Sequence, residues 1–327
     1  MRGLACPASL KGVLSPVDAA AALAEGMRRV PGWEADELPV ADGGEGTAEV
    51  LARVLGGEWQ TAAATDPLGR PVTARWLLLP DRTAVVDSAE AVGLGLLALE
   101  ERDPLWASSG GLGELLLAVL EAEPASVLVG VGGTATVDGG AGLRSALPQW
   151  PEGVPLRVAC DVRNPLLGPR GAARVFGPQK GAGPEAVAEL ERRLAALDEL
   201  RPYRDLPGAG AGGGLGAGLA ALGGELVEGA ELVLDLIGFD DRARDAALAV
   251  TGEGTVDDTT LGGKAPGAVV RRCARLGVRC VLFGGQVTKS HVDGVEVRAL
   301  SGDRSRARDD LVALGEELAR SAGDRAH

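Results

Sequence analysis

One glycine-rich stretch, SVLVGVGGTATVDGGAG at positions 126–142, contains residue types that could hold a phosphate group. It begins with the apolar run Val127–Val131, which is typical of a strand buried on both faces. Glycines let backbone N–H groups approach an anion, and threonine hydroxyls add further donors. The residues concerned are Gly132, Gly133, Thr134 and Thr136, with the carboxylate of Asp138 in the same loop. The stretch predicts a phosphate-handling loop, although an ordinary strand-to-helix turn has the same pattern.

Other polar residues follow further predicted strands, at the carboxyl ends where open parallel sheets bind their ligands. They are Ser9, Lys11, Asp42, Glu45, Asp161, Asn164, Gln179, Lys180, Glu253, Asp257 and Lys264. Carboxylates can hold Mg²⁺ and lysines can pair with phosphate, so the set as a whole suits phosphoryl transfer. Taken singly, each of these residues also fits a helix cap, a turn or a solvated surface charge.

Two common nucleotide-binding motifs do not account for these loops. The P-loop pattern GxxxxGK[ST] is absent from the sequence. Gly130-x-Gly132-x-x-Ala135 matches the loose dinucleotide fingerprint, but the acid that ends the next predicted strand, Asp161, lies too far along the chain. A P-loop enzyme is excluded, and nicotinamide binding is disfavoured.

Bulk composition excludes several other classes of protein. The 327 residues suffice for two domains or one large α/β unit, and the net charge of −13 argues against nucleic-acid binding. With two histidines, His291 and His327, neither a zinc site nor a Ser–His–Asp mechanism is expected. No signal peptide or membrane-length apolar run is visible. Four scattered cysteines without a CxxC pair are typical of a reduced, cytoplasmic protein.

The elements that must position these loops alternate between strand and helix at both ends of the chain, as in parallel α/β sheets. Strands are predicted at 1–6, 37–40, 246–251, 278–283 and 295–300, with helices at 16–29, 47–55, 264–276 and 306–322. The middle favours an antiparallel pair over 61–79, strands at 83–87, 127–131 and 156–160, and helices at 112–121 and 184–200. Ser108–Gly111 is expected to cap the helix at 112–121, and the glycine run 207–218 to open a short one.

With its loops assembled, the sequence resembles the bacterial class I glycerate kinase family. The shared segments are ADGGEGT (41–47), PLGR (67–70), AEAVGL (89–94), GGTATVDGGAG (132–142), ACDVRNPLLG (159–168), FGPQKGA (176–182), PGAGAGGGLG (207–216) and TGEG with GKAP (251–266). They recur in the family's order over most of the chain, and several run for seven or more residues. Chance similarity does not explain such a series.

The resemblance implies ATP-dependent phosphorylation of D-glycerate, with Mg²⁺, in a cleft between two α/β domains. It implies a flavodoxin-like, parallel-sheet domain made from residues 1–60 and 245–327. A mixed α/β domain, likened to restriction endonucleases, is inserted at 61–244. The product 2-phosphoglycerate is favoured over 3-phosphoglycerate. The expected partner is the small-molecule substrate, with no nucleic acid and no membrane, and a homodimer is left open.

The same resemblance suggests roles for individual residues. Lys11 and Lys180 would neutralise charge that develops on the transferred group. Asp42 or Asp161 would accept the substrate hydroxyl proton or hold Mg²⁺, and Asp257 is a third metal candidate. The residues expected to bind substrate or phosphate are Ser9, Gly43, Gly44, Glu45, Gly132, Gly133, Thr134, Thr136, Asp138, Asn164, Gln179, Glu253 and Lys264.

Three departures from the family's pattern leave a second hypothesis open. Ala8 stands where the family has an acid, and Val137 where it has an asparagine before Asp138. The piece between Leu143 and Leu156 is short, so that a helix or more is missing. The alternative is a catalytically impaired paralogue that binds nucleotide or a small hydroxy acid in a regulatory role. The retained lysines and carboxylates favour an active kinase.

Overall fold

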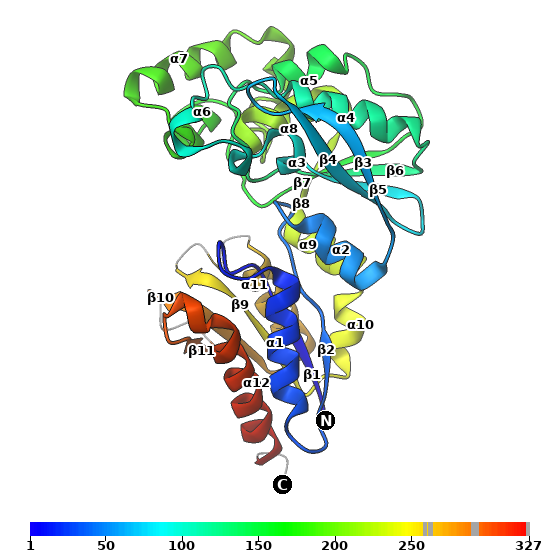
Figure 1. The fold of residues 1–327 in the computed structure, drawn as a ribbon, viewed down its shortest axis with the longest axis vertical. Coiled ribbons are helices and arrows are strands. Elements are labelled where there is room, and N and C mark those ends of the chain that lie inside the picture. Colours follow the sequence, from blue (N-terminus) through cyan, green and yellow to red (C-terminus); the bar gives the residue numbers. More distant parts are fainter. Residues whose placement is uncertain (258–259, 261–263, 289–293, 325–327) are drawn as a thin grey trace. The chain divides into compact units, whose positions relative to one another are not determined.

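The computed structural model describes residues 1–257, 260, 264–288 and 294–324; both histidines lie outside them. Contacts divide the chain into two units, which we describe separately. The first unit contains Met1–Asp42, Glu49–Val54 and Ala230–His327, and the second contains Gly43–Ala48 and Leu55–Gly229. The chain therefore begins and ends in the same unit (Figure 1).

The first unit is built on a five-stranded parallel sheet with the order β11-β10-β9-β1-β2. The strands are β1 (Arg2–Pro7), β2 (Glu34–Glu37), β9 (Leu248–Val256), β10 (Cys280–Val287) and β11 (Glu296–Ala299). Counted along this unit, the order is 2-1-3-4-5, that of flavodoxin-like folds. The predicted α/β fold with a parallel sheet is confirmed. The order reverses between β1 and β9, so their carboxyl ends form the switch point where such sheets bind ligands.

Helices α1 (Pro16–Arg28) and α12 (Ala307–Asp324) pack together on this sheet, side by side in Figure 1. The predicted start of α1 is confirmed, because the Ser15 hydroxyl accepts a hydrogen bond of 3.1 Å from the Asp18 amide. The two helices approach closely at Gly26, where an added Cβ would lie 2.0 Å from the Val312 carbonyl oxygen. Small residues at this crossing bring the backbones together.

The described part of the first unit contains further helices. They are α11 (Ala265–Leu276), α9 (Gly229–Leu236) and α10 (Phe239–Arg244), and most of α2 (Thr47–Leu55) belongs here too. The guanidinium of Arg272 on α11 is buried and lies 2.8 Å from Glu231 Oε2 and 2.6 Å from Asp235 Oδ1. It also lies 3.3 Å from Asp240 Oδ1. These ion pairs attach α9 and α10 to α11.

Three strand predictions in this unit have wrong limits. The second strand, β2, spans Glu34–Glu37 and not 37–40. It is an edge strand whose acids pair with arginines, Glu37 with Arg28 at 2.8 Å among them, so its apolar signal is weak. Strands β9 and β10 continue beyond the predicted ends, and Gln286 pairs with Thr255. Alternating glycines concealed this extension, because glycine is a poor strand former.

The second unit contains a mixed six-stranded sheet with the order β3-β4-β5-β6-β7-β8. The strands are β3 (Glu58–Thr65), β4 (Pro71–Leu78), β5 (Thr83–Asp87), β6 (Ser126–Gly130), β7 (Leu156–Cys160) and β8 (Glu225–Glu228). The first three pair antiparallel, as predicted for 61–79, and β5 to β8 run parallel. The edge strand β8 is four residues long and was not predicted.

The helices of the second unit are α3 (Ala89–Val92), α4 (Gly110–Glu121), α5 (Ala141–Ala146), α6 (Ala172–Phe176), α7 (Pro184–Ala195) and α8 (Ala211–Ala221). Short 3₁₀ turns include η3 (Pro178–Lys180) and η4 (Asp198–Tyr203). The predicted helix over 184–200 is wrong at its end, because η4 replaces its last turn. No helix of the described residues is long and apolar enough to cross a membrane.

Candidate functional site

The predicted site residues are divided between the two units. Those of the first unit are Ser9, Lys11, Asp42, Glu253, Asp257 and Lys264. Those of the second unit are Gly43, Gly44, Glu45, Gly132, Gly133, Thr134, Thr136, Asp138, Asp161, Asn164, Gln179 and Lys180. Each group is described within its own unit.

In the first unit the loop after β1 lies at the β1/β9 switch point. The Ala8 amide donates a 2.9 Å hydrogen bond to the Gly252 carbonyl, and the Cβ position of Gly254 lies 3.5 Å from the Lys11 amide nitrogen. Ser9 is half-buried and Lys11 is exposed. The loop that carries the predicted Ser9 and Lys11 therefore lies against the carboxyl-terminal half of β9, at Gly252 and Gly254.

Glu253, in the carboxyl-terminal half of β9, is the centre of a small polar cluster. Its Oε1 accepts a 2.8 Å hydrogen bond from the Thr260 hydroxyl, and its Oε2 lies 3.2 Å from Lys264 Nζ. The Asp257 amide donates to the same threonine oxygen at 3.0 Å. Thr260 is fully buried and was not singled out from the sequence, where two adjacent threonines made the choice ambiguous. The Glu253 carboxylate and the Lys264 ammonium thus lie next to each other at the start of α11.

In the second unit two predicted glycine-rich loops contact each other. An added Cβ on Gly132 would lie 2.7 Å from the Cα of Gly44, so this glycine permits close backbone approach. The Cβ position of Gly133 lies 2.9 Å from Glu45 Oε2, which places that exposed carboxylate over the loop. The segments 43–46 and 132–133 therefore form one surface.

Asp87, at the end of β5, anchors the first of these loops. Its carboxylate accepts hydrogen bonds from the Gly46 amide at 2.9 Å and from the Ala48 amide at 3.3 Å. The residue is 6% exposed. Sequence analysis did not assign Asp87 to the site, although a carboxylate at the end of a buried strand was the available signal. It positions backbone N–H groups of the ADGGEGT segment.

Thr134, Thr136 and Lys180 lie beneath the surface of the second unit. Their exposed fractions are 3%, 0% and 3%. Lys180 Nζ donates to the Thr134 hydroxyl oxygen at 3.0 Å and to the Thr136 carbonyl at 2.7 Å. Burial lowers the pKa of Lys180 to about 7, and the nearby Asp138 carboxylate acts in the opposite direction. The structure brings these residues together, with the Lys180 ammonium turned toward the Thr134 hydroxyl and the Thr136 carbonyl.

The carboxylate of Asp138 is occupied by donors of its own unit. It accepts from the Ser109 hydroxyl at 2.7 Å, and from the amides of Ser109 and Gly142 at 2.9 and 3.1 Å. Ser109 is the buried N-cap residue of α4, within the segment 108–111 that is predicted to cap this helix, but its hydroxyl makes no capping hydrogen bond to α4. Its oxygen instead accepts from the Leu143 amide at 2.9 Å. Asp138 and Ser109 thus join the starts of α4 and α5.

The remaining second-unit residues are less closely associated. Asn164 Nδ2 donates to the Arg170 carbonyl at 2.7 Å and so holds a turn. Gln179 is exposed, and Asp161 is half-buried directly after β7. Val137, one of the departures from the family's pattern, is 1% exposed and belongs to a hydrophobic core cluster with Leu166. The valine is a packing residue.

The described residues contain no group of three His, Cys, Asp or Glu side chains placed to hold a metal ion. Of the predicted ligands, Asp42 and Asp257 belong to the first unit and Asp161 to the second. Mg²⁺ is commonly bound by one or two carboxylates together with substrate phosphates and water. Carboxylates that are not clustered suit a Mg²⁺ ion that binds together with a nucleotide.

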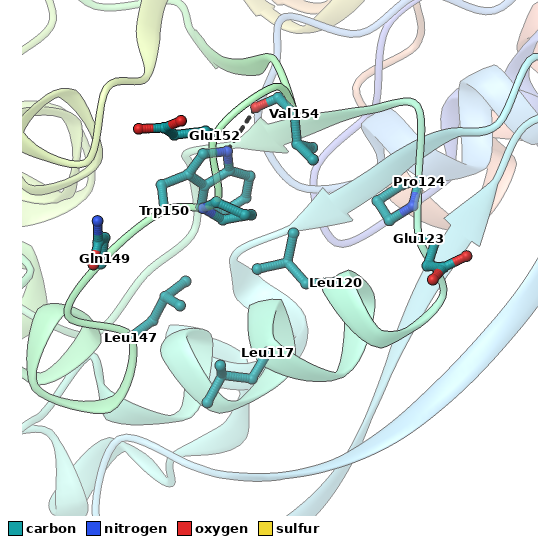
Figure 2. A pocket seen from close by; sticks show the side chains of 10 residues that line it. Leu117, Leu120, Glu123, Pro124, Leu147, Gln149, Trp150, Glu152 and Val154 are labelled. Atoms are coloured by element: carbon teal, nitrogen blue, oxygen red, sulfur yellow. Dashed lines mark hydrogen bonds between the residues drawn. The ribbon is translucent and has the colours of Figure 1, made fainter.

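A shallow apolar groove of about 580 Å³ lies elsewhere on the second unit (Figure 2). Leu117 and Leu120 of α4 form one side, and Leu147 and Trp150 line it from the following segment. The Trp150 indole donates to the Val154 carbonyl at 2.7 Å, which closes the 150–154 turn. None of the predicted site residues lines the groove, so we assign it no part in the chemistry.

Comparisons with known proteins agree on one family. The sequence profile of the glycerate kinase family matches residues 4–150 and 145–302. The glycerate 2-kinase of Escherichia coli (strain K12) is 39% identical over 306 aligned residues, which cover 81% of this chain and 80% of that protein. The glycerate kinase of Bacillus subtilis (strain 168) is 37% identical, with 88% and 86% covered.

A solved structure agrees as well. It is described as "putative glycerate kinase 2 from Salmonella typhimurium LT2", and it matches with a TM-score of 0.83 and 33% sequence identity. The match covers 99% of both chains. The two profile matches overlap at residues 145–150, within the stretch between Leu143 and Leu156 that is expected to be short.

Proposed function

The chain belongs to the glycerate kinase family of phosphotransferases, and we propose that it uses ATP to phosphorylate D-glycerate at the 2-hydroxyl. One observation carries the choice of position: the relative from Escherichia coli is named a glycerate 2-kinase and is 39% identical over about four-fifths of both chains. The site supports the reaction class, since exposed lysine, carboxylates and glycine-rich backbone segments are what phosphoryl transfer requires.

Positioning and charge neutralisation are the main tasks of such an enzyme, because the transferred group passes through a loose, charged transition state. Lys11 is exposed at the β1/β9 switch point and supplies a cation for the transferred group. Asp42 or Asp161 accepts the proton of the attacking hydroxyl. Backbone N–H groups of the 43–45 and 132–133 segments bind phosphate or substrate oxygens.

Mg²⁺ is proposed to bind with ATP, held by phosphate oxygens and one or two carboxylates among Asp42, Asp161 and Asp257. It would neutralise charge on the β- and γ-phosphates. Glu253 Oε2 and Lys264 Nζ form an ion pair of 3.2 Å at the start of α11. This pair is proposed to orient the ligand at the switch point.

A coupled assay tests the position of transfer. The protein is incubated with ATP, Mg²⁺, D-glycerate and enolase, which accepts 2-phosphoglycerate directly, and phosphoenolpyruvate is measured. Formation without phosphoglycerate mutase supports 2-phosphorylation. Formation that requires added mutase identifies the 3-hydroxyl as the acceptor and contradicts the proposed position.

The impaired-paralogue hypothesis remains the second candidate because Ala8 replaces an acid in the loop that carries Lys11. It predicts measurable ATP binding with no turnover of D-glycerate in the same assay. A second departure, Val137, does not favour it, since that side chain packs in the core.

Two substitutions test the proposed roles in the first unit. Lys11→Ala and Asp42→Asn are each expected to lower kcat on the order of 10²-fold or more, because each removes a charge that acts in the transition state. Circular dichroism and thermal unfolding check that both variants fold. Wild-type turnover in either variant would remove that residue from the mechanism.

A further inference from the structure

We propose that Lys180 is a positioning residue: it fixes the 132–138 segment through Thr134 and Thr136 and does not contact the transferred phosphoryl group. The inference rests on the proposed kinase function and assigns this lysine a different task from that of Lys11. Three observations carry it: the enclosure of the ammonium, the identity of its acceptors, and the way in which the rest of the segment is held.

The ammonium of Lys180 is enclosed by protein. The residue is 3% exposed, and its ammonium donates hydrogen bonds to the Thr134 hydroxyl oxygen, at 3.0 Å, and to the Thr136 carbonyl, at 2.7 Å. A cation that contacts a phosphoryl group has to be open to the ligand, as Lys11 is. Buried polar groups are instead held because each satisfies another. The Lys180 ammonium therefore binds protein atoms and not a ligand.

The two acceptors lie in the middle of a segment whose flanks are tied by backbone hydrogen bonds. On the amino-terminal side, the Leu94 amide donates to the Gly133 carbonyl at 2.7 Å. Between the two acceptors, the Ala135 amide donates to the Val92 carbonyl at 2.9 Å. On the carboxyl-terminal side, the Gly139 amide donates to the Gly213 carbonyl at 3.1 Å. Lys180 adds a side-chain attachment at Thr134 and Thr136, on either side of the Ala135 backbone hydrogen bond.

The Thr136 carbonyl is held in place from a second direction. A Cβ on Gly213 would lie 1.9 Å from this oxygen, so the carbonyl rests against a residue that must lack a side chain. Gly213 also has a φ of +76°, which disfavours other residues. The carbonyl is thereby directed at the lysine. Without the ammonium it would be a buried acceptor that has lost its partner, which costs free energy and loosens the segment.

The hydroxyl of Thr136 provides an internal comparison. It is buried and has no hydrogen-bond partner among the described residues, whereas the hydroxyl oxygen of Thr134 accepts from Lys180. The two threonines are two positions apart and both are buried. Changing each to valine removes one hydroxyl at nearly constant shape. Only the Thr134 change removes a contact of the lysine.

The experiment compares the full-length wild type with K180M, T134V, T136V and the double variant T134V/K180M. Methionine retains the length of lysine without its donors. Hydrogen exchange of peptides from 132–142 is measured without substrates, and kcat and KM for ATP are measured with D-glycerate. Exchange is expected to be faster on the order of tenfold in K180M, less so in T134V, and unchanged in T136V.

The kinetics separate positioning from direct contact. A displaced loop lowers kcat and raises KM for ATP together, by about 10²-fold in kcat/KM, and T134V adds little once Lys180 is absent. Direct charge neutralisation lowers kcat alone, leaves exchange at 132–142 as in the wild type, and makes the two substitutions additive. That second pattern would overturn the proposal.

The proposal can still be tested if K180M does not fold or if the wild type is inactive. If K180M does not fold, T134V against T136V still tests the contact by exchange, and equal exchange in the two would refute it. If the wild type turns over no glycerate, the proposed function fails, while the exchange comparison still reports on the lysine.

Discussion

Lysine is scarce in this chain, with four lysines among 33 basic residues, and three of the four lie in the predicted site loops. Arginine supplies the surface ion pairs, such as Arg28 with Glu37 at 2.8 Å. The three lysines have different surroundings: Lys11 is exposed, Lys264 is paired with Glu253, and Lys180 is buried. Lysines with different degrees of burial are therefore suited to different roles.

The lowered pKa of Lys180 predicts a pH-dependent stability. Burial lowers this pKa to about 7 from the usual 10.5, although the Asp138 carboxylate favours the ammonium. Between these two values the unfolded chain binds more protons than the folded chain, so the free energy of unfolding is expected to rise with pH. Urea unfolding at several pH values between about 7 and 9 measures the rise for the wild type and K180M.

The rise is expected to be smaller in K180M, since methionine does not titrate. An equal pH dependence in the two proteins would show that Lys180 keeps an ordinary pKa in the folded state.

Val137 tests whether a departure from the family's pattern affects packing or chemistry. Val137→Asn is expected to lower the free energy of unfolding by about 1–3 kcal/mol, because it buries an amide without partners in a hydrophobic cluster. Val137→Thr, which retains the shape, is the matched control and should cost less. Urea unfolding measures both. A Val137→Asn protein with wild-type stability but an altered KM for glycerate would place this side chain in the site.

Among the elements, helices α1 and α12 show how small residues organise the first unit. Gly26→Ala is expected to cost at least about 1–3 kcal/mol, because the new methyl group would lie 2.0 Å from the Val312 carbonyl and force the helices apart. Gly95→Ala is the control, since a Cβ there meets no atom within 4 Å. Hydrogen exchange of peptides from α1 and α12 measures the effect.

If Gly26→Ala and Gly95→Ala have equal effects on exchange, the close approach of α1 and α12 at Gly26 does not contribute to stability.

The strands show where sequence patterns succeed and fail. Apolar runs such as 156–160 were predicted with the limits that the structure has. The extension of β9 and β10 was missed because Gly252, Gly254 and Gly284 interrupt the apolar pattern within paired strands. Whether a segment forms a strand depends on the strand beside it as well as on its own residues.

At the scale of the whole molecule, each unit has its own hydrophobic core, built from Ala, Val and Leu with few aromatic residues. If ATP binds with Mg²⁺, binding stabilises the folded chain by mass action. At a ligand concentration of about 100 times Kd the gain is about 2.7 kcal/mol, which raises Tm by several degrees. Thermal unfolding with ATP and Mg²⁺, and again with excess EDTA, measures it.

EDTA is expected to remove most of the shift in Tm if the metal helps to hold the nucleotide. An equal shift with and without EDTA would contradict the proposed role of Mg²⁺.

By itself the sequence determined the family, the α/β alternation at both chain ends and the loops in which polar residues gather, because these depend on local residue order. Tertiary structure decided which polar groups are buried. Thr136 and Lys180 are 44 residues apart, and Asp138 and Ser109 are 29 apart. Contacts of this range depend on how α4, α5 and η3 pack, so no local pattern reveals that one lysine is enclosed while another is exposed.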